Sequence, residues 1–348
     1  MSKRLLFITP IFPKNDSEDN VVPFISQFTQ QFEANTDVKI DVISLMYPFS
    51  TNKYSIGNVT IYPMGSHFKS IVKQIPYLCK AILKGNLLHR QNPYDGILCF
   101  WYRESALVGK VLSSLLKIKL TVWMQGQDVK KDNKYIALLR IPAHQIVMMS
   151  LQQSKFFYAN HNIRIQKIAN VAVSRNLFPQ LNTGERPYTI LGVGNLGALK
   201  NYSLFIDIIS ELKNKNIRAI IIGEGEELAM LQEKVKLLGL TDKIHFLGRL
   251  PQATVLNYMS QSKIFLHTSK FEGGGAVIQE ALYSGCKVVS TIAIDKPIGE
   301  DDFYYNTEKK ALVEQIDRLL EKPLTHKRIE NFKMEHTIET IYRTFYKV

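Results

Sequence analysis

The sequence predicts an α/β protein with two domains, each a doubly wound parallel sheet covered by helices. Short runs of β-branched residues alternate with amphipathic segments of helical length along the whole chain, which is typical of strands joined by crossover helices. The chain has 348 residues and is 45% hydrophobic, which is enough apolar material for two cores. The third observation is a polar segment with two prolines and a glycine, FPQLNTGERP at 178–187, which is typical of a linker between two domains.

Eleven segments have the composition of buried strands. In the first half they are Arg4–Pro10, Lys39–Leu45, Val59–Pro63, Gly96–Trp101, Leu120–Met124 and Gln145–Met149. In the second half they are Tyr188–Gly194, Ala219–Gly223, Lys243–Leu247, Ile264–Thr268 and Lys287–Thr291. We therefore predict domains over 1–180 and 181–330, with a cleft between the carboxyl ends of their strands. Residues 331–348 are expected to form a helix that packs back on the first domain.

Composition excludes several classes of protein. No apolar run approaches the roughly 18 residues that a membrane-spanning helix needs. The opening MSKRLLFITPIF is interrupted by Pro10 and lacks a small-residue cleavage site, so we interpret it as a first strand and not as a signal peptide. The three cysteines have no metal-ligand spacing, which favours a reducing compartment and a cytoplasmic location.

The net charge of +13 is concentrated in the first half. Residues 1–185 contain 22 basic and 11 acidic residues, a balance of +11, whereas residues 186–348 contain 22 and 20, a balance of +2. This asymmetry predicts that the first half faces an anionic surface or substrate. No recognised nucleic-acid-binding motif is present, so a nucleic acid is not the expected partner.

The segment 66–90 is basic and amphipathic. At helical spacing it places Lys69, Lys73, Lys80 and Lys84 on one face and Ile71, Ile75, Leu78 and Ile82 on the other, with Pro76 and Gly85 as interruptions. One interpretation is a domain helix that packs its apolar face on the core. The other is docking to anionic lipid at the inner face of a membrane.

The most informative window is FEGGGAVIQEALYSGCKVVS at 271–290. A strand ends, three glycines turn the chain and a helix begins near Ala276. Gly273, Gly274 and Gly275 allow backbone N–H groups to approach an anion, and the start of a helix carries partial positive charge. Glu272 precedes the turn and Glu280 follows inside the helix, so both are expected to accept hydrogen bonds from sugar hydroxyls flanking a phosphate.

The alternative for this window is a plain loop with acids at a helix end. Among the histidines, we retain His267 as a candidate for this site because it lies near the end of the strand that precedes Glu272.

Two further glycine turns follow strands. GVGNLGALKN at 192–201 matches G-x-G-x-x-G, but the acid expected about 20 residues later falls inside a helix, which argues against dinucleotide binding. Lys200 is instead expected to neutralise a diphosphate, unless it is a solvated lysine at a helix start. IIGEGEE at 221–227 places Gly223 where a nucleobase or ribose would lie, or forms an ordinary turn.

These motifs resemble the retaining, GT-B fold glycosyltransferases of family 4. EGGGAVIQEALYSG resembles their E-x7-E motif, GNLGALKN their G-R-L-x-x-x-K-G turn and FLGRL at 246–250 their F-x-G-x-(V/L) strand. TVWMQGQDV at 121–129 is similar to their V-x-H-G-x-D segment, and FKMEHTIETIYRTFY to their C-terminal tail. The five motifs follow the family's order and spacing.

The resemblance implies transfer of a hexosyl unit from a nucleotide sugar to a glycan or lipid-linked acceptor, without a metal cofactor. It implies that Glu272 binds the donor sugar, Glu280 the ribose and Lys200 the diphosphate. The other implied donor-binding positions are Gly194, Asn195, Gly223, Gly273, Gly274, Gly275, Ala276, Arg249 and Leu250. In the first domain, Gln125 stands where the family has histidine and is grouped with the catalytic residues, and Gly126 and Asp128 are expected to line the acceptor side.

Two departures from the family pattern keep other functions open. Asn195 replaces an arginine that usually partners the lysine, and Gln125 cannot take a proton as histidine can. The alternatives are a non-catalytic GT-B subunit that binds a nucleotide or glycan beside a partner enzyme, and a nucleotide-sugar epimerase. The pathway we expect is surface polysaccharide biosynthesis, in the cytoplasm or peripheral to the membrane.

Overall fold

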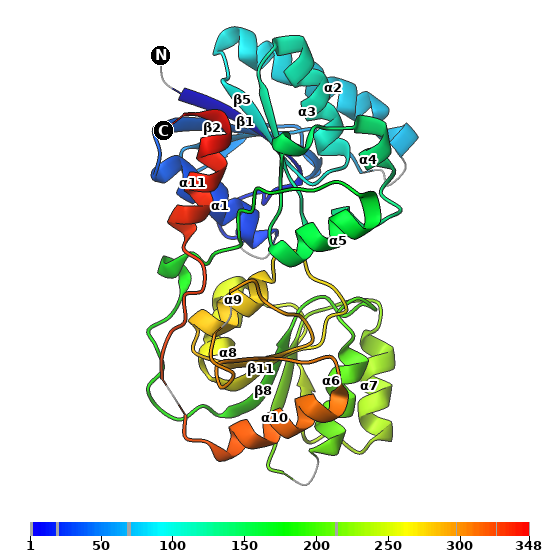
Figure 1. Ribbon diagram of the computed structural model, residues 1–348, viewed down its shortest axis with the longest axis vertical. Coiled ribbons are helices and arrows are strands. Elements are labelled where there is room, and N and C mark those ends of the chain that lie inside the picture. Colours follow the sequence, from blue (N-terminus) through cyan, green and yellow to red (C-terminus); the bar gives the residue numbers. More distant parts are fainter. Residues whose placement is uncertain are drawn as a thin grey trace. The chain divides into compact units, whose positions relative to one another are not determined.

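The computed structural model describes residues 3–18, 21–67, 71–212, 215–296, 298–324 and 326–347. The chain forms two compact units (Figure 1): unit 1 is Met1–Val171 with Met334–Val348, and unit 2 is Ala172–Lys333. Each unit contains one predominantly parallel sheet with helices packed against it. The predicted class of two Rossmann-like α/β units is therefore confirmed. The chain passes from unit 1 to unit 2 after Val171, whereas the polar segment suggested a boundary near 180.

Unit 1 contains a seven-stranded sheet in the order β3-β4-β2-β1-β5-β6-β7. Its strands are β1 (Lys3–Ile11), β2 (Val38–Tyr47), β3 (Tyr54–Ile56), β4 (Val59–Pro63), β5 (Gly96–Phe100), β6 (Lys119–Trp123) and β7 (Ile146–Val147). Its helices are α1 (Pro23–Ala34), α2 (Ile71–Gln91), α3 (Glu104–Leu116), α4 (Lys134–Leu139), α5 (Leu151–His161) and α11 (Met334–Phe345), with short 3-10 turns η1 (Gly126–Val129) and η2 (Ala143–Gln145). Strand β3, which was not predicted, pairs antiparallel with β4 and is only three residues long.

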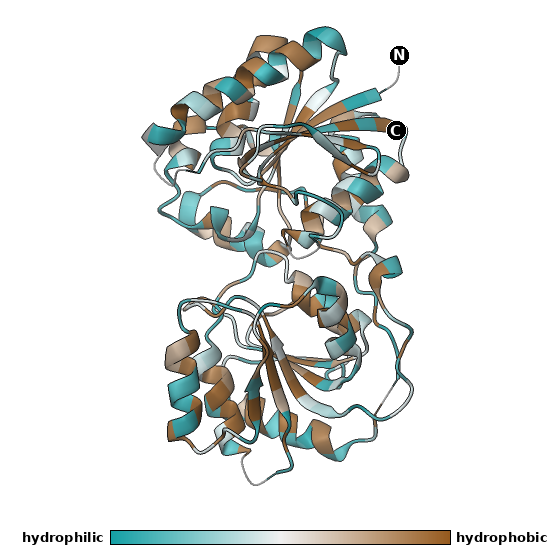
Figure 2. Ribbon diagram, turned by 180° about the vertical axis from the view of Figure 1, so that it is seen from behind, coloured by the Kyte–Doolittle hydropathy of each residue, from teal (hydrophilic) through white to brown (hydrophobic). Residues whose placement is uncertain are grey.

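An aromatic core lies under α1 in unit 1. Phe7 of β1, Phe28 of α1 and Trp123 of β6 are fully buried, and the rings of Phe28 and Trp123 meet edge to face at 4.8 Å. The last helix, α11, covers the same unit: the ring of Phe345 lies over Gly96, where a Cβ would come within 2.4 Å of it. The brown strands inside each unit in Figure 2 show the same segregation of apolar residues.

The helix α2 differs from the sequence prediction in two ways. It is continuous over 21 residues, so Pro76 and Gly85 do not interrupt it. Its buried face contains Leu78 and Gly85, and Ile75 is 51% exposed, although it was expected on the packed face. The physical reason is that Gly85 packs against Leu112 of α3: a Cβ added to Gly85 would lie 2.6 Å from the Leu112 Cδ1 atom. This close packing fixes the rotation of α2 about its axis. Lys69 and the side chain of Ile71 lie outside the described residues.

Unit 2 contains a six-stranded parallel sheet in the order β10-β9-β8-β11-β12-β13. Its strands are β8 (Tyr188–Val193), β9 (Ala219–Ile222), β10 (Ile244–Phe246), β11 (Ser262–His267), β12 (Lys287–Ser290) and β13 (Phe303–Tyr305), the last of which was not predicted. Its helices are α6 (Tyr202–Glu211), α7 (Leu228–Leu237), α8 (Gln252–Ser260), α9 (Ala276–Tyr283) and α10 (Lys309–Glu321), with a 3-10 turn η3 (Arg175–Leu177).

Two apolar clusters cover the two faces of the unit 2 sheet. One joins the sheet to residues of α6, α7 and α10, such as Phe205 and Ile316. The other joins it to α8 and α9 through residues such as Leu256 and Leu282. Because the strand order reverses at β8, the chain leaves adjacent strands β8 and β11 toward opposite faces, and the loops after them form the switch point at which such sheets bind ligands.

Among the described residues, no helix has the length and apolar composition required to span a bilayer.

Candidate active site

Two segments of unit 2 meet at the switch point of its sheet. Strands β8 and β11 are parallel neighbours, with Leu191 in register with Phe265. Their carboxyl ends therefore lie side by side, and the turn that carries Lys200 meets the loop 268–275. Two hydrogen bonds tie the segments together: the Lys270 N–H donates to the Leu199 carbonyl at 2.8 Å, and the Thr268 hydroxyl donates to the Lys200 carbonyl at 3.0 Å.

Glu272 lies at the centre of a compact polar cluster. Its Oε1 accepts from the Lys200 ammonium, from His267 Nε2 at 3.0 Å and from the Ser269 hydroxyl at 2.9 Å. Both charged side chains are largely buried, with exposed fractions of 23% for Lys200 and 17% for Glu272. The other carboxylate oxygen, Oε2, has no hydrogen-bond partner within the described part of the chain. The cluster thus fixes Oε1 of Glu272 and leaves Oε2 available to accept a hydrogen bond from a ligand.

The electrostatics of the cluster keep Glu272 ionised. Burial alone would raise the pKa of this carboxyl, but the hydrogen bond from His267 and the charge of Lys200 outweigh burial and hold the pKa at about 2. A carboxylate that stays ionised accepts hydrogen bonds only, so any ligand group at Oε2 must donate.

His267 orients Glu272 as a neutral donor. The ring is 4% exposed, and burial lowers its pKa below the ordinary 6.5, so it carries one ring hydrogen at pH 7. Since the ionised Glu272 can only accept, that hydrogen lies on Nε2. Nδ1 lies 3.2 Å from the Ser290 hydroxyl oxygen, whose own hydrogen is donated to the Ile292 carbonyl. His267 was a predicted candidate, whereas Ser269, two residues further along the chain, was not predicted and donates to the same carboxylate.

The glycine turn before α9 has the shape that the sequence predicted. The helix begins at Ala276, and Gly275 precedes it with φ of 61°, in the left-handed region that side chains avoid. The first N–H groups of a helix have no partners inside it, and their dipoles favour an anion. The glycine turn joins Glu272 to this helix start through Gly273, Gly274 and Gly275.

Glu280 takes a position away from the Glu272 cluster. It lies on α9, and its Oε1 accepts from Gln252 Nε2 of α8 at 2.8 Å. Burial raises its pKa to about 7, and the hydrogen bond from Gln252 only partly opposes that. No described contact joins Glu280 to Lys200 or Glu272. The structure thus brings Lys200 and Glu272 together and places the third predicted group on the helix beside them.

The two other glycine turns of unit 2 have a packing role. A Cβ on Gly223 would lie 1.8 Å from the carbonyl oxygen of Gly194, so the turns after β8 and β9 stack backbone against backbone. The N–H of Gly194 donates to the Ile222 carbonyl and that of Gly223 to the Gly248 carbonyl, at 3.0 and 2.9 Å. These N–H groups are therefore occupied in this structure.

The remaining donor-side candidates occupy the loops around these turns. The Asn195 side chain donates to the Glu224 carbonyl at 3.0 Å and so fastens one turn to the next. Arg249 is exposed in the loop between β10 and α8, and Leu250, beside it, packs on the apolar cluster of that face.

The candidates in unit 1 form a buried turn after β6. The Asp128 carboxylate accepts the N–H groups of Tyr102 and Gln125 at 2.7 and 2.9 Å, and burial raises its pKa to about 7. The Gln125 amide is also buried and donates to the Trp123 carbonyl at 3.2 Å. Gly126 opens the 3-10 turn with φ of 29°. In this structure Asp128 and Gln125 shape the turn itself, with Tyr102 as a partner that the sequence did not indicate.

Among the residues that the structure describes, no three histidine, cysteine or acidic side chains gather as metal ligands.

Comparison with known proteins gives a family match across unit 2. Residues 173–335 match the family described as glycosyl transferases group 1. The amylovoran biosynthesis glycosyltransferase AmsD of Erwinia amylovora is 32% identical over 54% of this chain and 56% of its own length. Three curated relatives are covered over only 22% to 56% of their own length.

Solved structures share the fold of the whole chain. Sucrose-phosphate synthase from Thermosynechococcus elongatus superposes with a TM-score of 0.75 at 14% identity, covering 99% of this chain and 95% of that one. Anabaena HepE in complex with UDP-glucose superposes with a TM-score of 0.67 at 15% identity, covering 98% and 93%. At these identities the likeness establishes the fold, and it confirms the predicted GT-B class.

Proposed function

Because residues 173–335 match the family described as glycosyl transferases group 1, we propose that this protein is a retaining transferase that moves a hexosyl unit from a nucleotide sugar to a glycan or glycolipid acceptor. The observation that carries the proposal is the meeting of Lys200, His267 and Glu272 beside the start of α9. The likeness to a relative named for amylovoran biosynthesis supports a role in making a surface polysaccharide.

The donor fits this cluster by charge and hydrogen bonding. Glu272 Oε2 lacks a partner in the described residues and accepts the hydroxyls of the donor sugar. Lys200 has three ammonium hydrogens, and one bond to Glu272 leaves others for the diphosphate. The start of α9 adds partial positive charge for the same group. Glu280, with its raised pKa, is assigned to the ribose hydroxyls.

The proposed reaction places positive charge where negative charge develops. The bond from the anomeric carbon to the phosphate oxygen breaks, a bond from that carbon to the acceptor oxygen forms on the same face, and the acceptor proton passes to the leaving phosphate. Lys200 and the α9 start stabilise the leaving nucleoside diphosphate, so no metal is required. The phosphate takes the proton, so Gln125 needs no basic role.

Turnover of a nucleotide sugar tests the proposal. A panel of UDP-, GDP- and ADP-sugars is first ranked by thermal shift, because a ligand that binds the native state raises its stability. With the best donor, Glu272→Ala and Lys200→Ala are expected to slow release of nucleoside diphosphate by at least ~10²-fold, the scale of losing one preorganised transition-state contact. Glu233→Ala and Lys236→Ala, two exposed positions on α7 of unit 2, are the matched controls. Rates like the wild type in both site variants would refute the assignment.

The same assay separates the non-catalytic alternative. Asn195 stands where the family has an arginine, and its side chain donates to the Glu224 carbonyl. Lys200 is therefore the side-chain cation predicted to bind the diphosphate. Tight binding of a nucleotide sugar with no release of nucleoside diphosphate, and no change at the anomeric or neighbouring carbons, would favour a binding subunit. Conversion of the sugar to its epimer would favour an epimerase.

Unit 1 is assigned to the acceptor side and to a cytoplasmic membrane surface. Residues 1–171 contain 21 basic and 10 acidic residues, a balance of +11. The outer face of α2 exposes Ile75, Leu83 and Leu87, at 51%, 69% and 49%, with the exposed Lys80 on the same helix. Apolar side chains flanked by lysines suit an anionic lipid surface. Co-sedimentation with anionic vesicles at low salt is expected, and Leu83→Gln with Leu87→Gln should abolish it; no pelleting of the wild type would refute it.

A further inference from the structure

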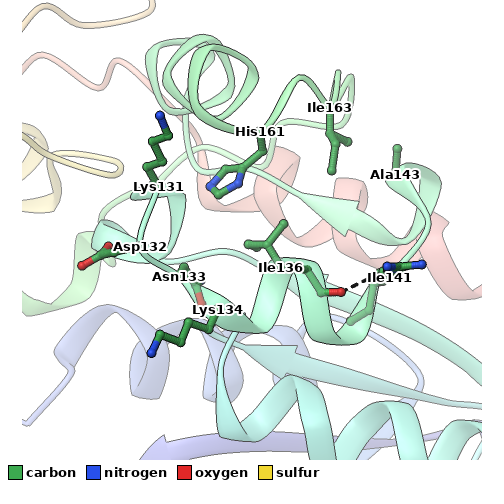
Figure 3. Close-up of a pocket in the computed structure, with 11 residues that line it drawn as sticks. Lys131, Asp132, Asn133, Lys134, Ile136, Ile141, Ala143, His161 and Ile163 are labelled. Atoms are coloured by element: carbon green, nitrogen blue, oxygen red, sulfur yellow. Dashed lines mark hydrogen bonds between the residues drawn. The ribbon is translucent and has the colours of Figure 1, made fainter.

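An open cavity of about 720 Å³ lies in unit 1 between α4, the η2 turn and the end of α5 (Figure 3). Its charged side chains do not converge, because Lys131 and Lys134 extend to opposite sides and Asp132 lies between them. This arrangement does not select one ligand group. In unit 2, by contrast, a buried hydroxyl lies beside the side chains already assigned to the donor.

The hydroxyl belongs to Tyr202, the first residue of α6. Its ring packs against the end of β8, where a Cβ added to Gly192 would lie 2.9 Å from the Tyr202 Cε1 atom. On the helix itself, the ring centroids of Tyr202 and Phe205 are 5.9 Å apart. These contacts leave Tyr202 only 4% exposed. The surrounding packing therefore holds the hydroxyl in one direction before a ligand binds.

The Tyr202 hydroxyl has no hydrogen-bond partner in the part of the chain that the structure describes. Its oxygen is not one of the fully buried side-chain atoms that lack a partner, so solvent reaches it. Most buried polar groups in proteins are hydrogen-bonded, and an unpaired one lowers stability. A phenylalanine at 202 would make the same ring contacts without that loss. The oxygen therefore points to a partner from outside the chain.

The oxygen lies next to the Lys200 side chain. A Cβ added to Gly194 would lie 3.4 Å from the Tyr202 hydroxyl oxygen and 3.5 Å from the Lys200 Cε atom, which are ordinary contact distances. Glycine at 194 thus leaves a small open space that both side chains border. Beyond Cε, the Lys200 ammonium pairs with Glu272. The hydroxyl is therefore close to the cation that is assigned to the diphosphate.

The protonation state of Tyr202 suits an anionic acceptor. Burial and the negative charge of Glu272 raise the pKa of the Tyr202 hydroxyl above its ordinary value of 10.0. The group thus keeps its hydrogen at neutral pH and can donate it. An ionised phosphate oxygen accepts hydrogen bonds, and a bond to a charged acceptor is stronger than one to a neutral acceptor.

We propose that the Tyr202 hydroxyl donates a hydrogen bond to the diphosphate of the nucleotide sugar, beside the ammonium of Lys200. The inference rests on the proposed function and adds to it a donor-binding residue outside the sequence motifs. The diphosphate stays on the nucleoside after transfer. The contact should therefore strengthen binding of the nucleotide sugar and of the free nucleoside diphosphate by the same factor.

Calorimetric titration of Tyr202→Phe, which lacks only the oxygen, tests the proposal. The probes are the best nucleotide sugar of the panel and the free nucleoside diphosphate of the same base. Tyr305→Phe, at a 46% exposed position of β13, is the matched control, and Lys200→Met reports the diphosphate site itself. Urea unfolding followed by far-UV circular dichroism measures whether the Tyr202 oxygen stabilises the free protein.

Tyr202→Phe is expected to bind both probes at least about tenfold more weakly than the wild type and Tyr305→Phe do, with an unchanged midpoint of urea unfolding. Wild-type affinity in Tyr202→Phe, together with weaker binding by Lys200→Met, would overturn this assignment and leave the proposed function standing. A loss confined to the nucleotide sugar would also overturn it, because the hydroxyl would then contact the sugar.

The unfolding measurement can contradict the proposal as well. A lower midpoint in Tyr202→Phe would show that the oxygen already has a partner in the free protein, which would overturn the assignment. If the wild type bound neither a nucleotide sugar nor a nucleoside diphosphate, both this assignment and the proposed function would fail.

Discussion

Replacing Glu272 with glutamine removes the charge at the centre of the proposed site and nearly preserves its shape. Glutamine can still accept from Ser269 and His267, but it no longer offsets the ammonium of Lys200, which is 23% exposed. We expect Glu272→Gln to destabilise unit 2 at pH 7 because a largely buried charge loses its partner.

The magnitude follows from the pKa of Glu272. It lies at about 2, against 4.5 for an unperturbed glutamate, a difference of 2.5. Each pKa step of one corresponds to about 1.4 kcal/mol, so the ionised carboxylate contributes about 3 kcal/mol to the free energy of unfolding. Because the folded pKa is the lower one, this contribution is complete above pH 4.5 and is lost as the pH falls toward 2. At pH 3 less than half of it, about 1 kcal/mol, should remain.

Urea unfolding monitored by two probes measures this effect. Both tryptophans, Trp101 and Trp123, lie in unit 1, so their fluorescence reports that unit, whereas far-UV circular dichroism reports both. Glu272→Gln should lower the transition seen only by circular dichroism, and less so at pH 3 than at pH 7. Glu233→Gln, on the exposed side of α7, is the matched control. Equal stability of Glu272→Gln and the wild type at both pH values would show that the charge of Glu272 does not stabilise the cluster.

Three further predictions test other parts of the account. Gly223→Ala places a Cβ 1.8 Å from a backbone oxygen, so unit 2 should lose at least about 2 kcal/mol in urea unfolding, whereas Gly299→Ala, which meets open space, should lose little. Burial raises the pKa of Glu280 to about 7, so the affinity for the donor should increase as the pH rises through 7 and the carboxylate ionises. The plot of donor affinity against pH should lose its inflection near 7 in Glu280→Gln. An inflection that remains in this variant would belong to another titrating group. Turnover should be unchanged in EDTA, and a loss that Mg²⁺ restores would contradict the charge role given to Lys200.

Much of the fold was accessible from the sequence because the signals are local. The strand of β11, the three glycines and the helix starting at Ala276 follow one another within a few residues, and each has an unambiguous local preference. Lys200 and Glu272 were both predicted, but their contact depends on the adjacency of β8 and β11 in the sheet. That adjacency comes from the strand order of doubly wound sheets, which spacing along the chain does not contain.

Other features depend on tertiary packing and could not be predicted. The rotation of α2 is fixed by the approach of Gly85 to Leu112, so helical periodicity alone assigned Ile75 to the wrong face. The hydrogen bond from the Tyr102 N–H to Asp128 is likewise set by the loop after β5, which is distant in sequence. Local patterns find elements and candidate residues, whereas contacts between distant segments decide what each residue touches.

The most direct test of the central claim is calorimetric binding of the best donor in the nucleotide-sugar panel to wild type, Lys200→Met and, as a control on α7, Lys236→Met. We predict that Lys200→Met weakens binding at least tenfold, because the diphosphate loses its ammonium partner, while Lys236→Met binds like the wild type. Equal affinity in all three proteins would show that the nucleotide sugar is held elsewhere.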